Sequence, residues 1–301
     1  MSKGTRFITT LVGLAVLGLA TAAVALAATI IGTEGPDNLT GTPEADQISA
    51  LGGNDRVRAL AGNDEVNAGK GNDRVGAGAG NDRVRGESGA DRLVGGAGDD
   101  DVRGTAGGDL IIGNGGADKL VGDAPNTGDL TSRDRVFGGA GNDRVVGGDS
   151  RDRLHGGAGN DRTHGNGGRD LISGGSGDDV SAGNRGDDVI FANRGADMSS
   201  GGRGNDILWA LARADVSEEG IDTLKGEEGN DDLRTRDGEP DRVDCGPGND
   251  VARLDLVDVI VDATAENPNG SCERVVRAAP KPRADAAENS TENPPEDSQQ
   301  S

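Results

Sequence analysis

Residues 53–93 read GNDRVRALAGNDEVNAGKGNDRVGAGAGNDRVRGESGADRL and repeat one pattern of nine residues. In each repeat a glycine precedes an aspartate by two positions, and an aliphatic residue follows the aspartate by two positions. The aspartates of this stretch are Asp55, Asp64, Asp73, Asp82 and Asp91. A fixed period along a chain is the signature of a repeat architecture, in which each repeat forms one structural unit.

The same phase extends over most of the chain. It begins at Asp37 and ends at Asp250, and it is interrupted near residues 123–132 and near residues 210–221, where one step is lengthened. A disordered glycine-rich linker is the alternative to a folded repeat. Disorder does not require aspartates and aliphatic residues in a fixed phase, so the folded repeat is favoured.

Each repeat predicts a tight turn followed by a short strand. Gly138–Asp143 (GGAGND) is rich in residues that tolerate a positive φ, which favours a turn. The next three residues, Arg144–Val146, form a short strand whose middle side chain points inward. Two turns and two strands make one coil of 18 residues, and coils stack at the strand spacing of ~4.8 Å. The sequence therefore predicts an all-β, parallel β-solenoid.

Stacking of the coils would place the aspartates in two columns, with alternate repeats on opposite edges. Carboxylates at that spacing repel one another unless a cation lies between them. Carboxylates and turn carbonyls form an all-oxygen ligand set that suits Ca²⁺, whereas Mg²⁺ requires stricter octahedral geometry and retains its waters. We expect multiple Ca²⁺ ions, with the metal ligands Asp55, Asp64, Asp73, Asp82, Asp91, Asp100, Asp109, Asp118, Asp143, Asp152, Asp161, Asp170, Asp179, Asp188, Asp197, Asp206 and Asp231.

The repeats resemble the hemolysin-type (RTX) calcium-binding nonapeptide G-G-x-G-x-D-x-U-x. Close matches are Gly95–Asp100 (GGAGDD), Gly156–Asp161 (GGAGND), Gly174–Asp179 (GGSGDD) and Gly201–Asp206 (GGRGND). The resemblance covers about residues 32–250 and implies a right-handed parallel β-roll with Ca²⁺ between the turns of consecutive coils. It also implies ligand pairs 18 residues apart, such as Asp82 with Asp100 or Asp143 with Asp161, together with turn carbonyls.

Two departures from the family pattern bear on function. Alanine replaces the first glycine of the early repeats, so weaker calcium binding is expected there, at Ala50, Ala59, Ala68 and Ala77. The sequence also contains no H-E-x-x-H pair and no G-x-S-x-G elbow, and nothing outside the repeats is large enough for a catalytic or pore-forming domain. The sequence therefore resembles a secreted, repeat-only member of the family.

Composition and charge disfavour several classes of protein. The chain of 301 residues has 54 glycines and only 1% aromatic residues, so it lacks the large side chains that fill the core of a conventional enzyme. Its formal net charge of −22 works against binding to nucleic acid or to an anionic membrane surface. We expect no catalytic site and no nucleic-acid partner.

Residues 1–27 are expected to be a signal peptide. Lys3 and Arg6 precede an apolar run from Phe7 to Ala27 that ends in a small-x-small cleavage pattern. Cleavage would leave a secreted chain that starts at Ala28 and has no membrane span. An uncleaved anchor is the alternative, because ~20 apolar residues can cross a bilayer. Either outcome predicts an extracellular location, and association with the cell surface stays open.

The C-terminal region is expected to close the roll. We place the roll at residues 28–253, a cap at residues 254–277 and a disordered tail at residues 278–301. In an exported chain the two cysteines, Cys245 and Cys272, most simply form one disulfide.

An apolar patch is expected late in the roll. Val189, Phe191, Ile207 and Trp209 would face outward on adjacent coils. Polar residues take inward positions in the same region, at Thr163, Ser181 and Ser199. An exposed apolar patch usually marks a contact surface. The alternative is that residues 210–221 fold back and cover the patch.

Three functions follow from these observations. The leading hypothesis is a secreted, non-catalytic calcium-binding repeat protein that folds on binding extracellular Ca²⁺. The second is a calcium-stiffened adhesion or matrix module that binds a glycan or a protein through the apolar patch. The third is a carbohydrate-active β-solenoid enzyme, which the absence of tyrosine disfavours.

Overall fold

The computed structural model describes residues 26–123, 131–210 and 220–279. Almost all of the expected signal peptide, most of both interruptions and the tail from residue 280 therefore lie outside the described residues. Within the described ranges the chain forms strands and turns, and it has no helix that is long and apolar enough to cross a membrane.

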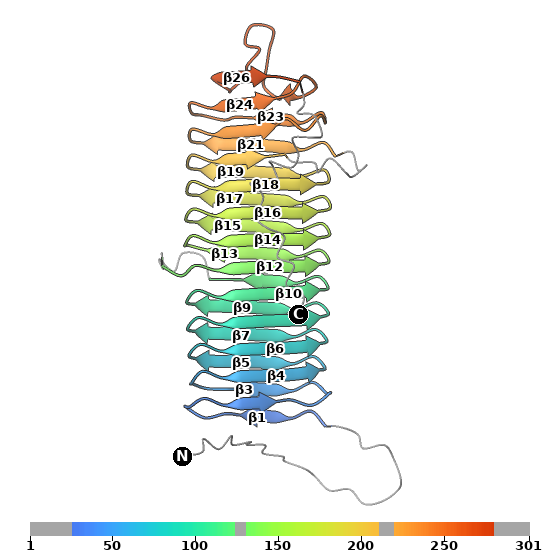
Figure 1. The fold of residues 1–301 in the computed structure, drawn as a ribbon, viewed down its shortest axis with the longest axis vertical. Helices are drawn as coiled ribbons and strands as arrows, with labels where there is room; N and C mark the ends of the chain where they lie inside the picture. The colour runs from blue at the N-terminus through green and yellow to red at the C-terminus, as the bar shows by residue number, and fades with distance from the viewer. Residues whose placement is uncertain (1–25, 124–130, 211–219, 280–301) are drawn as a thin grey trace, which may run out of the picture. The chain divides into compact units, whose positions relative to one another are not determined.

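The chain divides into two compact units, one that ends at Gly148 and one that begins at Asp149. In the first unit the strands alternate between two parallel sheets, ordered β1-β3-β5-β7-β9-β11-β13 and β2-β4-β6-β8-β10-β12 (Figure 1). Its strands are β1 (Thr29–Ile31), β2 (Asn38–Thr40), β3 (Gln47–Ser49), β4 (Arg56–Ala61), β5 (Glu65–Lys70), β6 (Arg74–Ala79), β7 (Arg83–Ser88), β8 (Arg92–Ala97), β9 (Asp101–Ala106), β10 (Leu110–Gly115), β11 (Lys119–Val121), β12 (Arg135–Ala140) and β13 (Arg144–Gly148).

The second unit repeats the same alternation. Its two sheets have the orders β15-β17-β19-β21-β23-β25 and β14-β16-β18-β20-β22-β24-β26. Its strands are β14 (Arg153–Ala158), β15 (Arg162–Gly167), β16 (Leu171–Ser176), β17 (Val180–Arg185), β18 (Val189–Arg194), β19 (Met198–Arg203), β20 (Ile207–Trp209), β21 (Thr223–Glu228), β22 (Asp232–Thr235), β23 (Arg242–Asp244), β24 (Val251–Leu254), β25 (Val259–Ile260) and β26 (Arg274–Arg277).

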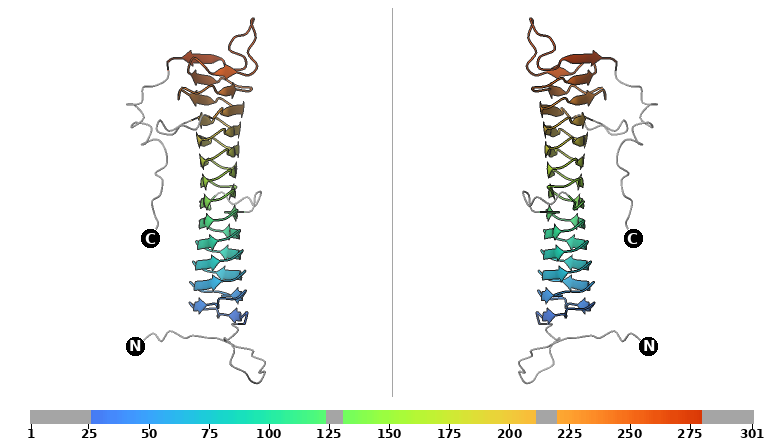
Figure 2. Two further views of the ribbon diagram at one scale, coloured as in Figure 1. Left: turned by 90° about the vertical axis from the view of Figure 1, so that its right-hand side faces the viewer. Right: turned by 90° about the vertical axis from the view of Figure 1, so that its left-hand side faces the viewer.

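Strands pair in parallel with strands one coil away, not with their neighbours in the chain. Arg56 of β4 lies beside Arg74 of β6, and Arg74 lies beside Arg92 of β8, so the register advances by one coil of 18 residues. Within each unit the strands fall into two facing layers when seen edge-on (Figure 2). The predicted all-β, parallel β-roll is therefore confirmed.

The strands are longer than the sequence predicts. Most span six residues instead of three, because the first three positions of the following turn continue the strand ladder. Each strand therefore directs two side chains inward. In β6 these are Val75 and Ala77, which are 3% and 0% exposed. A core of one aliphatic side chain and one alanine or glycine per strand explains why few large residues are needed.

The fourth position of most turns holds glycine, and a steric reason explains it. Gly80 has a φ of 129°, and a methyl group there would collide with the carbonyl oxygen of Gly62 one coil away. Gly98 has a φ of 120° and meets the carbonyl of Gly80 in the same way. Coils thus approach one another backbone to backbone at this position, where only glycine fits.

The C-terminal strands extend the ladders of the second unit. β25 pairs with β23, and β26 pairs with β24, within the region expected to form the cap. Cys245 and Cys272 form a disulfide with a Cα–Cα distance of 5.2 Å. It joins the turn that follows β23 to the segment that leads into β26, so it ties the last two coils together.

Candidate metal centres

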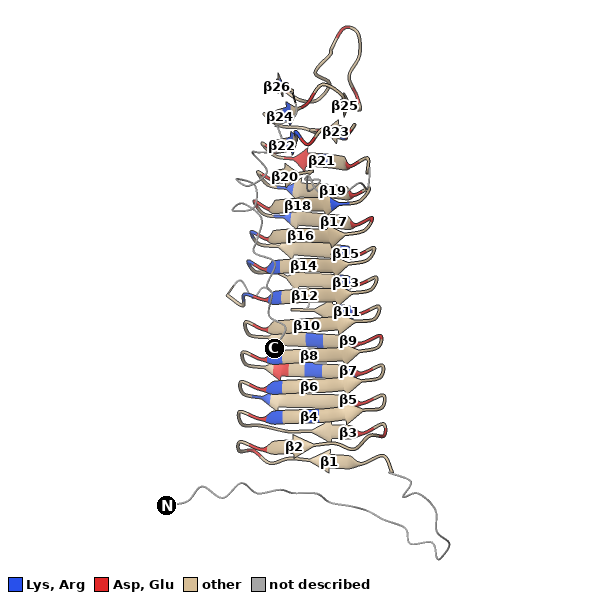
Figure 3. Ribbon diagram, turned by 45° about the vertical axis from the view of Figure 1, so that its right-hand side comes forward, with Lys and Arg blue, Asp and Glu red and all other residues tan. Residues whose placement is uncertain are grey.

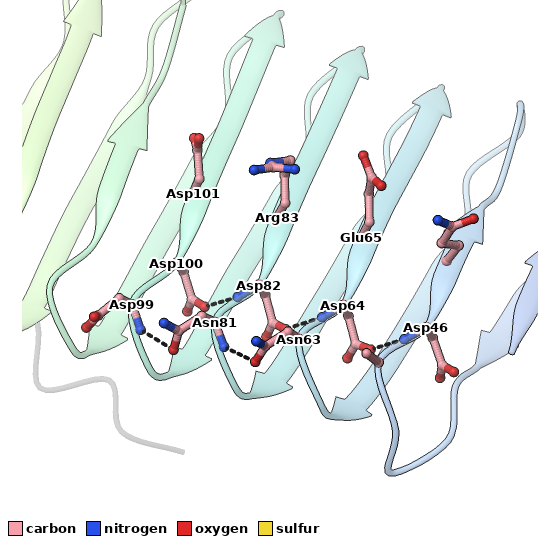
Figure 4. A pocket seen from close by; sticks show the side chains of 12 residues that line it. Asp46, Asn63, Asp64, Glu65, Asn81, Asp82, Arg83, Asp99, Asp100 and Asp101 are labelled. Atoms are coloured by element: carbon pink, nitrogen blue, oxygen red, sulfur yellow. Dashed lines mark hydrogen bonds between the residues drawn. The ribbon is translucent and has the colours of Figure 1, made fainter. Parts of the chain in front are cut away.

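The phased aspartates form buried ladders along the turn edges. The backbone N–H of Asp82 donates to Oδ1 of Asp100 at 2.8 Å, and the N–H of Asp64 donates to Oδ1 of Asp82 at 2.8 Å (Figure 4). Both acceptor aspartates are only 3% exposed. The same bond recurs on the opposite edge, from the N–H of Asp73 to Asp91. The backbone of one coil therefore holds each carboxylate of the next.

The second carboxylate oxygen has no such partner. Among the described residues, no donor reaches the buried Oδ2 atom of a long series of these aspartates. The series comprises Asp55, Asp64, Asp73, Asp82, Asp91, Asp100, Asp109, Asp118, Asp170, Asp179, Asp188, Asp197, Asp206, Asp231, Asp241 and Asp250. A buried acceptor without a partner is costly, and its recurrence along the ladders indicates sites that suit a positive group.

The orphaned oxygen faces a second oxygen across a small cradle. Oδ2 of Asp91 and the carbonyl oxygen of Gly104 both lie within 2.9 Å of the point where a methyl group on Gly86 would sit. Oδ2 of Asp188 and the carbonyl of Gly201 converge in the same way on Gly183. The first glycine of the repeat therefore leaves a space lined by a carboxylate and a carbonyl, the hard oxygen donors that Ca²⁺ takes.

Burial makes the ladder carboxyls weaker acids in the folded chain than in the unfolded chain. Desolvation raises the pKa of Asp100 to about 7, and it raises the pKa of Asp170 and of Asp197 to about 9. The neighbouring carboxylates add to the rise, and the backbone hydrogen bond to Oδ1 opposes it. The ionised form that a metal ion needs is thus disfavoured until a cation compensates the charge.

Side chains alone do not complete a metal centre here. Within the described ranges, no group of three or more His, Cys, Asp or Glu side chains is placed to hold one ion. An ion in these cradles would take its other ligands from turn carbonyls. The predicted donor set, carboxylate plus turn carbonyl, stays a prediction.

The structure brings together most of the predicted ligand pairs, through backbone-to-carboxylate bonds. Asp118 and Asp143 remain neighbours across the first interruption, since the N–H of Asp118 donates to Oδ1 of Asp143 at 2.8 Å. Asp206 and Asp231 meet likewise across the second. Asp152 and Asp161 are buried, and their N–H groups donate to Asp170 and Asp179. Asp143 belongs to the first unit and its expected partner Asp161 to the second.

Sequence reasoning missed an outer ladder beside the buried one. The N–H of Asn72 donates to Oδ1 of Asn54 at 2.8 Å, and the N–H of Asn81 donates to Oδ1 of Asn63 at 2.9 Å. Asp99 continues the second column, and it lines the same pocket as the buried Asp82 and Asp100 (Figure 4). The Asn-Asp pair that ends many turns is the sequence feature from which this outer ladder could have been predicted. Where this position holds asparagine or aspartate, its side-chain oxygen thus ties consecutive coils at the surface.

Comparison with known families agrees with this geometry. The profile of the RTX calcium-binding nonapeptide repeat (4 copies) matches residues 31–66, 40–75, 58–93, 67–102, 94–124, 137–172, 173–208 and 217–252. These stretches cover well over half of the chain. The chain belongs to the RTX calcium-binding nonapeptide repeat family. A search of curated proteins finds no match.

The RTX repeats of this chain do not all have the same cradle. Ala59, Ala68 and Ala77 occupy the first turn position and are fully buried, so a methyl group lies in the space that glycine leaves open elsewhere. A methyl group at the equivalent Gly86 would crowd both oxygens of the cradle. The weaker calcium binding expected for the early repeats thus has a steric basis, and it stays a prediction.

Glycine at these three positions is expected to strengthen calcium binding. Relief of about 1 kcal/mol of crowding per site would lower the calcium midpoint of Ala59→Gly/Ala68→Gly/Ala77→Gly by roughly fivefold. Ala61→Gly/Ala79→Gly/Ala97→Gly is the matched control, because these alanines lie at the third turn position and are not buried. Calcium titrations followed by circular dichroism measure both. Equal midpoints for the two triple variants would contradict the steric argument.

The apolar patch is not exposed as the sequence predicts. Phe191 is only 3% exposed, so the expectation that its ring faces solvent is wrong. The ring stacks on Trp209 with centroids 6.1 Å apart, and the guanidinium of Arg234 lies 4.1 Å from the Trp209 ring centroid. Val189, Ile207 and Trp209 are half-buried. Aromatic and cationic side chains on neighbouring strands therefore cover one another.

Proposed function

We propose that this chain is a secreted, non-catalytic calcium-binding repeat protein whose coils fold as Ca²⁺ binds. The observation that carries the proposal is the row of buried Oδ2 atoms that face carbonyl oxygens with no donor between them among the described residues. The family profile and the apolar segment before Ala28 support the calcium chemistry and the secretion, respectively.

Each coil has two aspartates that would hold the metal, one on each edge. Their ionised Oδ2 atoms repel the carbonyl oxygens of the next coil, which opposes stacking. Bound Ca²⁺ supplies the positive charge that removes this repulsion. Because every repeat contacts only its neighbours, stacking is expected to spread from coil to coil. Extracellular calcium modules bind at ~10⁻⁴–10⁻³ M, and we expect that range.

The test is a calcium titration of the chain from Ala28 onward, after treatment with EGTA. Far-UV circular dichroism should show a cooperative gain of β structure near millimolar Ca²⁺, and MgCl₂ should not reproduce it. A β spectrum in EGTA at neutral pH that calcium leaves unchanged would mean that the core alone holds the roll. That result would overturn the proposed function.

A glycan- or protein-binding role through the apolar patch has no support in this arrangement. Phe191 of β18 and Arg234 of β22 lie on the two strands that flank β20, and both lie against the Trp209 ring. A sugar ring that stacks on an aromatic face therefore has no platform here. We do not extend the proposal to that surface.

A further inference from the structure

A column of unpaired arginines runs along one turn edge of the first unit. Arg56, Arg74 and Arg92 are the first residues of β4, β6 and β8, and they lie side by side in the parallel register. All three are exposed. Within the described residues, none of the three guanidinium groups makes an ion pair or a hydrogen bond. Figure 3 shows the blue segments at the starts of β4 and β6.

The equivalent column of the other sheet is built differently. There the first positions of neighbouring strands alternate in sign, as Glu65, Arg83, Asp101 and Lys119. Lys119 lies 3.6 Å from Asp101 and forms an ion pair with it, and Arg83 lies beside the same aspartate in the register. Like charges on adjacent strands destabilise a sheet, whereas opposite charges stabilise it. The arginine column therefore carries three cations for which its own sheet supplies no anion.

The surface beside the arginine column is accessible to a ligand. The outward positions next along β4, β6 and β8 are Arg58, Gly76 and Val94. A methyl group on Gly76 would meet nothing within 4 Å, so an approaching chain can lie close to the backbone there. Arg58 is also exposed and adds a fourth cation. The cations thus follow the stacking direction at the strand spacing of ~4.8 Å, which suits a linear ligand.

Bound calcium would change the net charge along the turn edge that carries the arginine column. Each arginine directly follows a buried ladder aspartate, namely Asp55, Asp73 or Asp91. One ionised aspartate and one arginine per coil cancel each other. A divalent cation at a cradle leaves a surplus of positive charge, since bound metal ions are often the largest local charges in a site. The cradle of Asp91 has Gly86 at its first position, whereas Ala50 and Ala68 narrow those of Asp55 and Asp73, so the latter two fill at higher calcium. The edge therefore attracts anions only when the cradles are filled.

We propose that Arg56, Arg74 and Arg92 form a calcium-dependent binding edge for a linear acidic polysaccharide. Guanidinium groups recognise carboxylates and sulfates through paired hydrogen bonds, which supports this ligand class. Single-stranded nucleic acid is the less suitable polyanion, because its binding relies on aromatic platforms and the outward positions of β4, β6 and β8 hold none. The calcium dependence rests on the proposed function, and the arginine column does not.

The experiment measures binding of the full chain to dextran sulfate and to hyaluronate, in millimolar CaCl₂ and in EGTA. Neutral dextran and oligo-dT are the comparison ligands. Arg56→Gln/Arg74→Gln/Arg92→Gln should lose about tenfold or more in affinity, because three charge-assisted contacts disappear. The matched control is Arg83→Gln/Lys119→Gln/Arg144→Gln, which removes three cations from the first positions of β7, β11 and β13. It should stay within about twofold of the parent.

The outcomes separate this inference from the proposed function. Circular dichroism of each variant reports whether calcium still folds the roll. A chain that folds with calcium but binds neither acidic polymer overturns the binding edge and leaves the calcium function intact. Equal losses in the two triple variants overturn the specific column, and equal binding of oligo-dT overturns the ligand class. A specific loss that is the same in EGTA keeps the column and overturns its dependence on calcium.

Discussion

Without calcium, the folded chain is expected to be stable near pH 4 and to lose its β structure as the pH rises toward 9. The ladder carboxyls have an unfolded pKa near 3.8, and burial raises the folded pKa to about 6 for Asp55, about 7 for Asp109 and about 9 for Asp170. A raised pKa means that the folded state binds more protons than the unfolded state between those values. Its contribution to stability is therefore full below about pH 4 and disappears as the pH passes the folded pKa.

The expected size of this effect is large. One pKa unit corresponds to about 1.4 kcal/mol, so ionising a few such carboxyls costs as much as the ~5–15 kcal/mol that usually stabilises a domain. The measurement is far-UV circular dichroism against pH, in metal-free buffer and in millimolar CaCl₂. Calcium should keep the chain folded through neutral pH. Metal-free β structure that persists unchanged from pH 4 to pH 9 would show that these carboxyls ionise without cost.

A pair of isosteric variants tests the cause. Asp170→Asn replaces a carboxyl that the fold must keep protonated at pH 8, although its unfolded pKa is near 3.8. The variant should therefore stabilise the metal-free chain at pH 8 and weaken its response to calcium. Asp187→Asn is the control, because Asp187 is exposed and lies where other turns carry asparagine. Its side chain already accepts the N–H of Asn205, as an asparagine would. A similar stabilisation in both variants would point to overall charge instead of burial.

Gly80→Ala is expected to destabilise the roll by about 3 kcal/mol or more, since a left-handed alanine and a backbone collision add together. The φ of Gly80 is 129°, and a methyl group would meet the Gly62 carbonyl and the amide oxygen of Asn63. The backbone of the neighbouring coil cannot move away without breaking its own ladder bonds. Urea unfolding of the calcium-loaded chain measures the loss.

Gly76→Ala is the matched control for that substitution. Gly76 lies only four residues away, in an outward strand position where a methyl group has open space. Removing glycine from a strand there should leave stability unchanged or raise it slightly, by about 0.5 kcal/mol. Equal losses for Gly76→Ala and Gly80→Ala would show that glycine matters here for composition alone and not for the close approach of coils.

The repeat made most of the fold predictable from the sequence. Each nonapeptide carries its own turn signal, inward aliphatic residue and aspartate, and a solenoid unit contacts only the units beside it. Val57, Val75 and Leu93 are buried as predicted, because local alternation alone decides which side of the strand they take. The two sheets form through contacts between adjacent repeats, so the local sequence pattern was sufficient to predict them.

Several features of the site depended on how the coils stack. The backbone N–H of the preceding coil occupies Oδ1 of each ladder aspartate and leaves Oδ2 as the oxygen without a partner. That choice arises from the spacing between coils, which no single repeat encodes. Phe191 shows the same limit, since its burial depends on Trp209 and Arg234 from later strands.

By itself the sequence determined the period, the parallel roll, the inward aliphatic residues and the kind of ion that the aspartates suit. Those properties belong to single repeats and to their spacing along the chain. Only the tertiary structure decided which carboxylate oxygen faces the cradle, that the methyl group of a first-position alanine lies in that cradle, and that the arginine column of one sheet is unpaired while the other sheet's column alternates its charges. Each of these depends on atoms of adjacent coils, which lie a full coil apart in the sequence and within hydrogen-bond distance in space.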